Sequence, residues 1–174
     1  NIILNNTTIN DFDDYGIYSE SDSSIITLNS SSISGGNGDG IWTDGSNMEI
    51  SLYGSEISDF NGDGLNASGS DVIINSQYSF INDNDYGIYA PSAEINLSST
   101  MISHNNVYGI YTTGRVNINY SNITFNNNIG IYLGGNSFSD IKNSIIWGNN
   151  TNNFRQIHTQ NGVTSIIYST VQGL

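Results

Sequence analysis

The sequence predicts an all-β fold, a right-handed parallel β-helix solenoid of about eight coils with 21–26 residues each. The Ile, Val, Tyr and Phe residues favour strands, whereas the good helix formers are scarce. A Gly-Ile-aromatic tripeptide recurs along the chain, and large apolar residues stand seven and fourteen residues before each of its glycines. Together these observations predict one structural unit, repeated along a single domain that spans residues 1–174.

The first two strands of each coil are centred on two series of apolar residues. The first series is Ile2, Ile26, Ile50, Ile73, Ile95, Val116 and Phe138. The second series is Ile9, Ile33, Ile57, Phe80, Ile102, Ile123, Ile145 and Val171. Apolar and polar residues alternate around them, as in Ile26-Thr27-Leu28, which is typical of strands with one buried face. We therefore expect residues such as Ile57 and Ile102 to form the core.

The third strand of each coil opens with a glycine. These glycines are Gly16, Gly40, Gly64, Gly87, Gly109 and Gly130. Three short strands per repeat, with no helix between them, wind into a solenoid whose sides are parallel sheets. Leucine is too rare for a leucine-rich repeat, and the six-residue period of a hexapeptide β-helix is absent.

A series of asparagines is expected at one corner of the coils, four residues after the apolar residue of each second strand. It consists of Asn37, Asn61, Asn84, Asn106, Asn127 and Asn149. Asparagine tolerates left-handed backbone and suits a sharp corner. Stacked amides also hydrogen-bond from coil to coil.

The motif Ile-x-x-x-Asn-x-x-Gly-Ile-Tyr resembles the right-handed parallel β-helix repeat of pectate-lyase-like and polymorphic-outer-membrane-type proteins. Asn143–Asn149 and Val163–Gly173 are similar to the closing coils of secreted bacterial β-helix proteins. The resemblance implies an extracellular or cell-surface location, with the chain either whole or a processed piece of a larger secreted protein. It does not fix the function, because this architecture serves lyases, hydrolases, adhesins and fibres alike.

Charge excludes several kinds of partner. The chain has 3 Lys and Arg against 16 Asp and Glu, a net charge of −13. This balance argues against binding nucleic acid or anionic lipid. No apolar run approaches the roughly 18 residues of a membrane span, and the absence of cysteine excludes disulfides.

Catalytic chemistry has little support in the sequence. A lyase acting on acidic polysaccharide needs a basic proton abstractor, but Arg115, Lys142 and Arg155 lie apart from any acidic cluster. His104 and His158 are interpreted as surface residues. We expect no enzyme activity and no obligatory cofactor.

Calcium is the one cofactor that the sequence suggests. Asp59-Phe-Asn61-Gly-Asp63-Gly matches the opening of a calcium loop, in which alternate oxygens meet a hard cation. The candidate ligands are Asp39, Asp59, Asn61, Asp63 and Asp85. The alternative is turn chemistry, because Asn, Asp and Gly also belong at bends.

An aromatic strip shares one register of the third strand: Tyr18, Trp42, Tyr89, Tyr111 and Tyr132. The strip is either a stacking ladder that stabilises one sheet or a contact surface for sugar rings or a neighbouring subunit. Eight N-glycosylation sequons are compatible with a secreted glycoprotein, at Asn5, Asn6, Asn29, Asn66, Asn96, Asn119, Asn122 and Asn149.

We therefore predict a noncatalytic extracellular β-helix with a structural or adhesive role. Its expected partners are copies of itself, joined into a filament, or flanking domains, both through the coil ends. The alternatives are a carbohydrate-binding module and a polysaccharide lyase or hydrolase domain.

Overall fold

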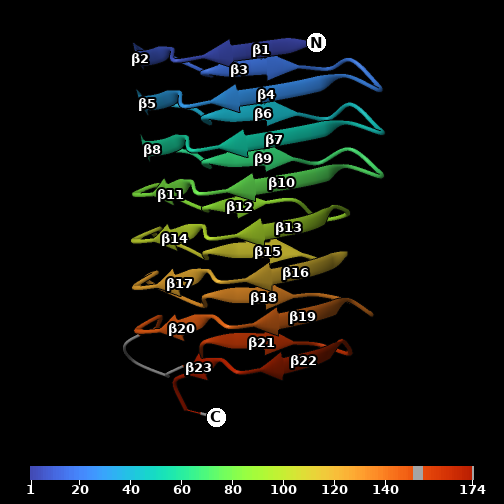
Figure 1. The fold of residues 1–174 in the computed structure, drawn as a ribbon. Helices are drawn as coiled ribbons and strands as arrows, with labels where there is room; N and C mark the ends of the chain where they lie inside the picture. The colour runs from blue at the N-terminus through green and yellow to red at the C-terminus, as the bar shows by residue number, and fades with distance from the viewer. Residues whose placement is uncertain (151–154, 174) are drawn as a thin grey trace.

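The computed structural model describes residues 1–150 and 155–173, and these form a parallel β-helix with three sheets and no helix (Figure 1). The strands follow one another in the order of the three sheets, so that each set of three completes one coil. Seven complete coils and the first two strands of another are present, close to the eight that the repeat predicts. No helix in the described part of the chain is long and apolar enough to cross a membrane.

Sheet A contains the first strand of every coil. Its members are β1 (Ile2–Asn5), β4 (Ile25–Asn29), β7 (Glu49–Tyr53), β10 (Ile73–Gln77), β13 (Glu94–Ser98), β16 (Arg115–Asn119), β19 (Phe138–Lys142) and β22 (Val163–Ile167). Sheet B contains the second strands. They are β2 (Thr8–Phe12), β5 (Ser32–Gly36), β8 (Glu56–Phe60), β11 (Phe80–Asn82), β14 (Met101–Ser103), β17 (Asn122–Thr124), β20 (Ile145–Trp147) and β23 (Thr170–Val171).

Sheet C contains the third strands, each of which follows a repeated glycine except the last. They are β3 (Ile17–Ser19), β6 (Ile41–Thr43), β9 (Leu65–Ala67), β12 (Ile88–Tyr89), β15 (Ile110–Thr112), β18 (Ile131–Leu133) and β21 (Ile157–Thr159). The glycines are required by space. A Cβ atom added to Gly87 would lie 2.6 Å from the carbonyl oxygen of Gly109 and 2.7 Å from Cγ2 of Ile102.

The core is a column of aliphatic side chains from all three sheets. Ile57 and Ile102 are completely buried, as predicted. In the register of sheet B, Ile57 is followed by Ile81 and then by Ile102. In sheet A the corresponding series runs through Ile50, Ile74 and Ile95.

Four members of the predicted core series are therefore wrong by one residue. Ile73, Phe80, Phe138 and Ile145 point outward, with 42%, 47%, 55% and 46% of their surface exposed. The buried residues in their place are Ile74, Ile81, Ser139 and Ile146. At three of these positions two bulky residues are adjacent, so composition alone does not say which faces inward, and a slip of one reverses the face. Phe138 is different, because the small polar residue Ser139 takes the buried position beside it.

A serine ladder fixes the corner between sheets A and B. The backbone N–H of Ser31 donates to Oγ of Ser55, and that of Ser121 donates to Oγ of Ser144, both at 3.1 Å. These serines are buried and lie one coil apart. The residue before each has left-handed backbone, for example Ser30 at φ 47°. At the corner this backbone N–H belongs to neither sheet, and the serine hydroxyl of the next coil serves as its acceptor.

Candidate binding groove

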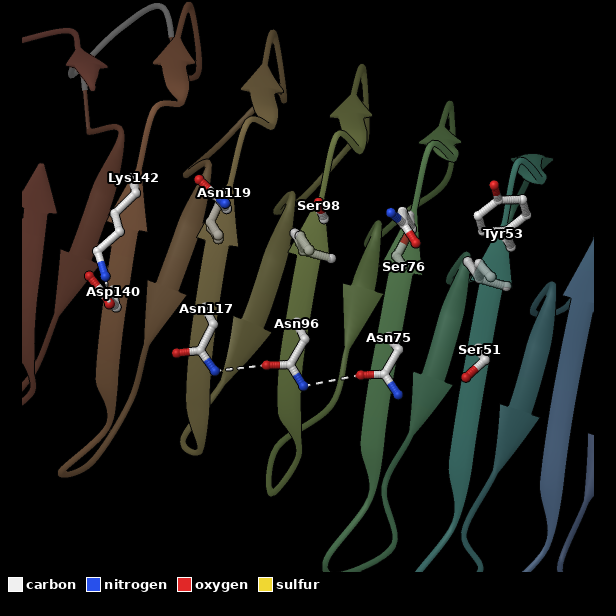
Figure 2. Close-up of a pocket in the computed structure, with 14 residues that line it drawn as sticks. Ser51, Tyr53, Asn75, Ser76, Asn96, Ser98, Asn117, Asn119, Asp140 and Lys142 are labelled. Atoms are coloured by element: carbon white, nitrogen blue, oxygen red, sulfur yellow. Dashed lines mark hydrogen bonds and ion pairs between the residues drawn. The ribbon is translucent and has the colours of Figure 1, made fainter. Parts of the chain in front are cut away.

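The outer face of sheet A carries a groove of about 590 Å³. Fourteen residues of β7, β10, β13, β16 and β19 line it (Figure 2). Because neighbouring strands lie about 4.8 Å apart, five strands span roughly 19 Å along the solenoid axis. The groove therefore suits an elongated ligand that crosses several coils.

Two rows of polar side chains face this groove from alternate positions of the strands (Figure 2). The central row is Ser51, Asn75, Asn96, Asn117 and Asp140. The second row is Tyr53, Gln77, Ser98, Asn119 and Lys142. Both rows arise from the strand period of two, since the residues between them turn into the core.

The three asparagines of the central row form the groove ladder. Nδ2 of Asn96 donates to Oδ1 of Asn75 at 3.1 Å, and Nδ2 of Asn117 donates to Oδ1 of Asn96 at 2.7 Å. Each of these contacts spans 21 residues of sequence, one coil. The ladder holds the amides at a fixed spacing along the groove.

The groove ladder retains hydrogen-bonding capacity. A side-chain amide has two N–H donors and two acceptor lone pairs on its oxygen. The contacts along the ladder use one donor and one lone pair of Asn96, whose side chain is partly exposed. One donor and one lone pair of Asn96 remain to face the groove, so the ladder can bind a ligand without being dismantled.

A second asparagine ladder is buried, and at Asn105 all four hydrogen-bonding capacities of the amide are used. Nδ2 of Asn105 donates to Oδ1 of Asn126 and to the carbonyl oxygen of Ile81, and its Oδ1 accepts from both the backbone N–H and Nδ2 of Asn84. The buried ladder comprises Asn84, Asn105, Asn126, Asn149 and Gln156. Because all of its members are buried, its role is structural.

The predicted asparagine series mixes two columns, and this is a correction. Asn84 and Asn149 belong to the buried ladder, whereas Asn37, Asn61, Asn106 and Asn127 lie one position further on. In this exposed column Nδ2 of Asn61 donates to Oδ1 of Asn37 at 2.9 Å, and Asn127 donates to Asn106 at 3.4 Å. Adjacent asparagines such as Asn105 and Asn106 made the two columns indistinguishable in the sequence.

The aromatic strip lies along the outer face of sheet C, in one register. Tyr18 and Trp42 stack at 4.8 Å with a 6° interplanar angle, and Tyr111 stacks on Tyr89 and on Tyr132 at 5.1 Å. His158 extends this column at 4.9 Å from Tyr132. Rings stacked in this way cover one another's faces and leave mainly their edges to the solvent. The arrangement therefore favours a stabilising role over the stacking of sugar rings.

The strip is interrupted at Asn66. Its Nδ2 donates to Oδ2 of Asp39 at 3.0 Å, and Oδ1 of Asp39 accepts from the backbone N–H of Asp63 at 2.7 Å. Asp63 in turn accepts from the backbone N–H of Tyr86 at 3.2 Å. Burial, and then the neighbouring charge of Asp39, raise the pKa of Asp63 to about 7. Burial also raises the pKa of Asp39.

The five candidate calcium ligands lie in four different environments. Asp39 and Asp63 share the column just described, while Asn61 belongs to the exposed asparagine column. Asp59 occupies the corner before it with left-handed backbone at φ 64°. Asp85 lies next to Tyr86, and its backbone N–H donates to the carbonyl oxygen of Gly62. Within residues 1–150 and 155–173, no three Asp, Glu or His side chains form a group that could hold a metal ion.

His104 and the asparagines of the glycosylation sequons lie at separate places on the surface and corners. His104 is exposed at a left-handed corner and packs on Phe125, with ring centroids 5.7 Å apart. Asn96 and Asn119 are the two sequon asparagines that line the groove. The sequon of Asn149 ends at Thr151, which lies outside the described residues.

The groove was not predicted, although its central row left a signal. Asn75, Asn96 and Asn117 recur every 21 residues, directly after Ile74, Ile95 and Val116 of the buried series. Once the strand register is known, this spacing places the three amides side by side on the outer face.

Comparison of the chain with family models, with curated proteins and with solved structures found no significant match. The parallel β-helix is thus established by its own geometry.

Proposed function

We propose that this chain is a noncatalytic, extracellular carbohydrate-binding β-helix that holds a neutral polysaccharide along the groove of sheet A. The observation that supports it best is the groove ladder, a row of partly exposed amides at coil spacing with unused donors and acceptors. Sugar hydroxyls are both donors and acceptors, so they complement an amide that offers both.

Charge favours a neutral ligand. The fourteen groove residues include one carboxylate, Asp140, and one amine, Lys142, which pair at 2.6 Å. The net charge of −13 repels a polyanion such as a polyuronate. The polysaccharide of this proposal is therefore not the acidic one that the pectate-lyase-like resemblance implies.

The same residues favour binding over hydrolysis. Glycoside hydrolysis generally requires two carboxyl groups about 5–10 Å apart on either side of the bond to be cleaved. Asp140 is the one carboxylate among the fourteen residues that line the groove, and its Oδ2 is engaged by Lys142. A groove lined by one paired carboxylate and by amide and hydroxyl side chains is consistent with a binding role.

Titration calorimetry with linear neutral hexasaccharides tests the proposal, using gluco-, manno- and xylo-configured probes and a galacturonate hexamer as the acidic comparison. Asn96→Leu removes the middle amide of the ladder, and Asn122→Leu makes the same change at an exposed position of sheet B. We expect a neutral hexasaccharide to bind, Asn96→Leu to weaken it at least tenfold, and Asn122→Leu to leave it unchanged. Failure of all neutral probes, or equal binding by Asn96→Leu, would overturn the proposal.

A second candidate function, end-to-end assembly, is favoured by the terminal coils. Ile2, Leu4, Ile9 and Phe12 pack against the core but remain partly exposed, as does Val171 at the other end. Further coils would bury them, whether these belong to a second copy or to a longer chain. Sedimentation velocity of this chain and of Ile2→Lys/Val171→Lys distinguishes the outcomes. We expect concentration-dependent polymers from the unmodified chain alone, and a strictly monomeric unmodified chain would contradict assembly between copies.

A further inference from the structure

The two ends of the groove ladder are not equivalent. At one end, Nδ2 of Asn75 donates to Oε1 of Glu49 at 3.1 Å, and Oγ of Ser51 donates to the same oxygen. At the other end, Asn117 lies opposite Asp140 in the register of β16 and β19. Since Nδ2 of Asn117 points back to Asn96, its amide oxygen faces Asp140 (Figure 2). A carboxylate thus meets a donor at one end of the ladder and an acceptor at the other.

Asp140 is only half satisfied. Its Oδ2 accepts from Nζ of Lys142 at 2.6 Å. Its Oδ1 is buried and has no hydrogen-bond partner. A buried acceptor without a donor is rare in folded proteins and destabilises the folded state.

No rearrangement within the ladder supplies the missing donor. Three amides in a row, each donating to the next, have a donor at one end and an acceptor at the other. If all three amides were reversed, Asn117 would donate to Asp140, but Asn75 would then present its oxygen to Glu49. Because both ends face carboxylates, one end always lacks a donor, and the donor has to come from outside the ladder.

We propose that Asn117 and Asp140 form a subsite for a pair of neighbouring hydroxyl groups, an inference that rests on the proposed function of the groove. One hydroxyl donates to the Asp140 carboxylate, whose side chain is 39% exposed and can rotate Oδ1 towards the groove, and the other donates to Oδ1 of Asn117. A metal cation fits less well, because the ammonium group of Lys142 already neutralises Asp140 and repels a second positive charge. The subsite anchors the ligand at the β19 end and gives the groove a direction.

A diol probe tests this subsite separately from polysaccharide binding. Asp140→Asn introduces a donor that can complete the ladder at Asn117, and this fills the subsite from within. Asp83→Asn is the matched control, because it makes the same acid-to-amide change at an exposed corner away from the ladder. The probes are cis-1,2-cyclohexanediol and cyclohexanol, followed through the side-chain amide signals of Asn117 and Asn75 in 15N-labelled protein.

We expect the diol to shift the Asn117 signal in a saturable manner, and cyclohexanol to shift it much less. Asp140→Asn should abolish the diol response with its folded spectrum retained, and weaken the best neutral hexasaccharide at least tenfold. Asp83→Asn should change neither. Equal responses to the two probes, or an unchanged diol response in Asp140→Asn, would overturn the subsite. If a hexasaccharide binds but the diol gives no response, the subsite is wrong and the proposed function stands. If the diol gives a response but no hexasaccharide binds, the proposed function is wrong and the subsite stands.

Discussion

Asn105 donates a 2.8 Å hydrogen bond from Nδ2 to Oδ1 of Asn126 one coil further on, and both side chains are buried. Oδ1 of Asn105 also accepts from the backbone N–H and from Nδ2 of Asn84, at 3.1 Å each. This link therefore joins three successive coils at the corner between sheets B and C. It also distinguishes a residue of structural importance from its neighbour Asn106.

Asn105→Ala should destabilise the protein by at least about 2 kcal/mol, because two buried donors of Asn84 lose their acceptor. Asn106→Ala, in the exposed column, should change stability by no more than about 0.5 kcal/mol. Equilibrium denaturation in guanidinium chloride measures both. Similar losses for the two variants would contradict the assignment of the buried ladder.

The corrected register of sheet B makes a second prediction. Ile81 is completely buried between Ile57 and Ile102 of the neighbouring coils, so Ile81→Ala should cost about 2–5 kcal/mol. Phe80 is 47% exposed, and Phe80→Ala should cost less than about 1 kcal/mol despite removing the larger side chain. The register would be wrong if Phe80→Ala were the more damaging change in urea denaturation.

Asp63 should make stability depend on pH. Burial and the charge of Asp39 raise its pKa from 3.8 to about 7 in the folded chain. Between these values the folded state binds more protons than the unfolded state, so the contribution of Asp63 is complete below about pH 4 and lost as the pH rises through about 7. The free energy of unfolding should therefore decrease over this range.

Asp63→Asn keeps an oxygen for the N–H of Tyr86 and removes the charge, so it should stabilise the protein more at pH 8 than at pH 5. Asp83→Asn removes one charge from an exposed corner and serves as the control. Denaturant unfolding at the two pH values decides the matter. Parallel pH profiles for Asp63→Asn and the unmodified chain would show that Asp63 does not cause the dependence.

The repeated glycines and aliphatic residues were sufficient to predict the solenoid, because each occupies a position that tolerates little else. Gly87 has no room for a Cβ atom, and Ile57 is surrounded by the core. The register was ambiguous where similar residues are adjacent, as at Phe80 and Ile81 or at Asn105 and Asn106. Only the pairing of strands between coils decides which member of each pair faces inward.

The groove was harder to predict, for a different reason. Asn75, Asn96 and Asn117 have ordinary surface character one by one, and their importance lies in their alignment across β10, β13 and β16. The missing donor at Asp140 depends on atomic detail, namely which end of each amide faces the next coil. Sequence periodicity carries no information about that direction.

A neutral polysaccharide bound along sheet A should perturb that sheet and leave the other two unchanged. The decisive measurement is a map of the backbone amide shifts of 15N-labelled protein with the tightest neutral hexasaccharide. We expect the largest shifts on β7, β10, β13, β16 and β19, with the aromatic face of sheet C unchanged. Shifts concentrated on β12, β15 and β18, around Tyr89, Tyr111 and Tyr132, would contradict it.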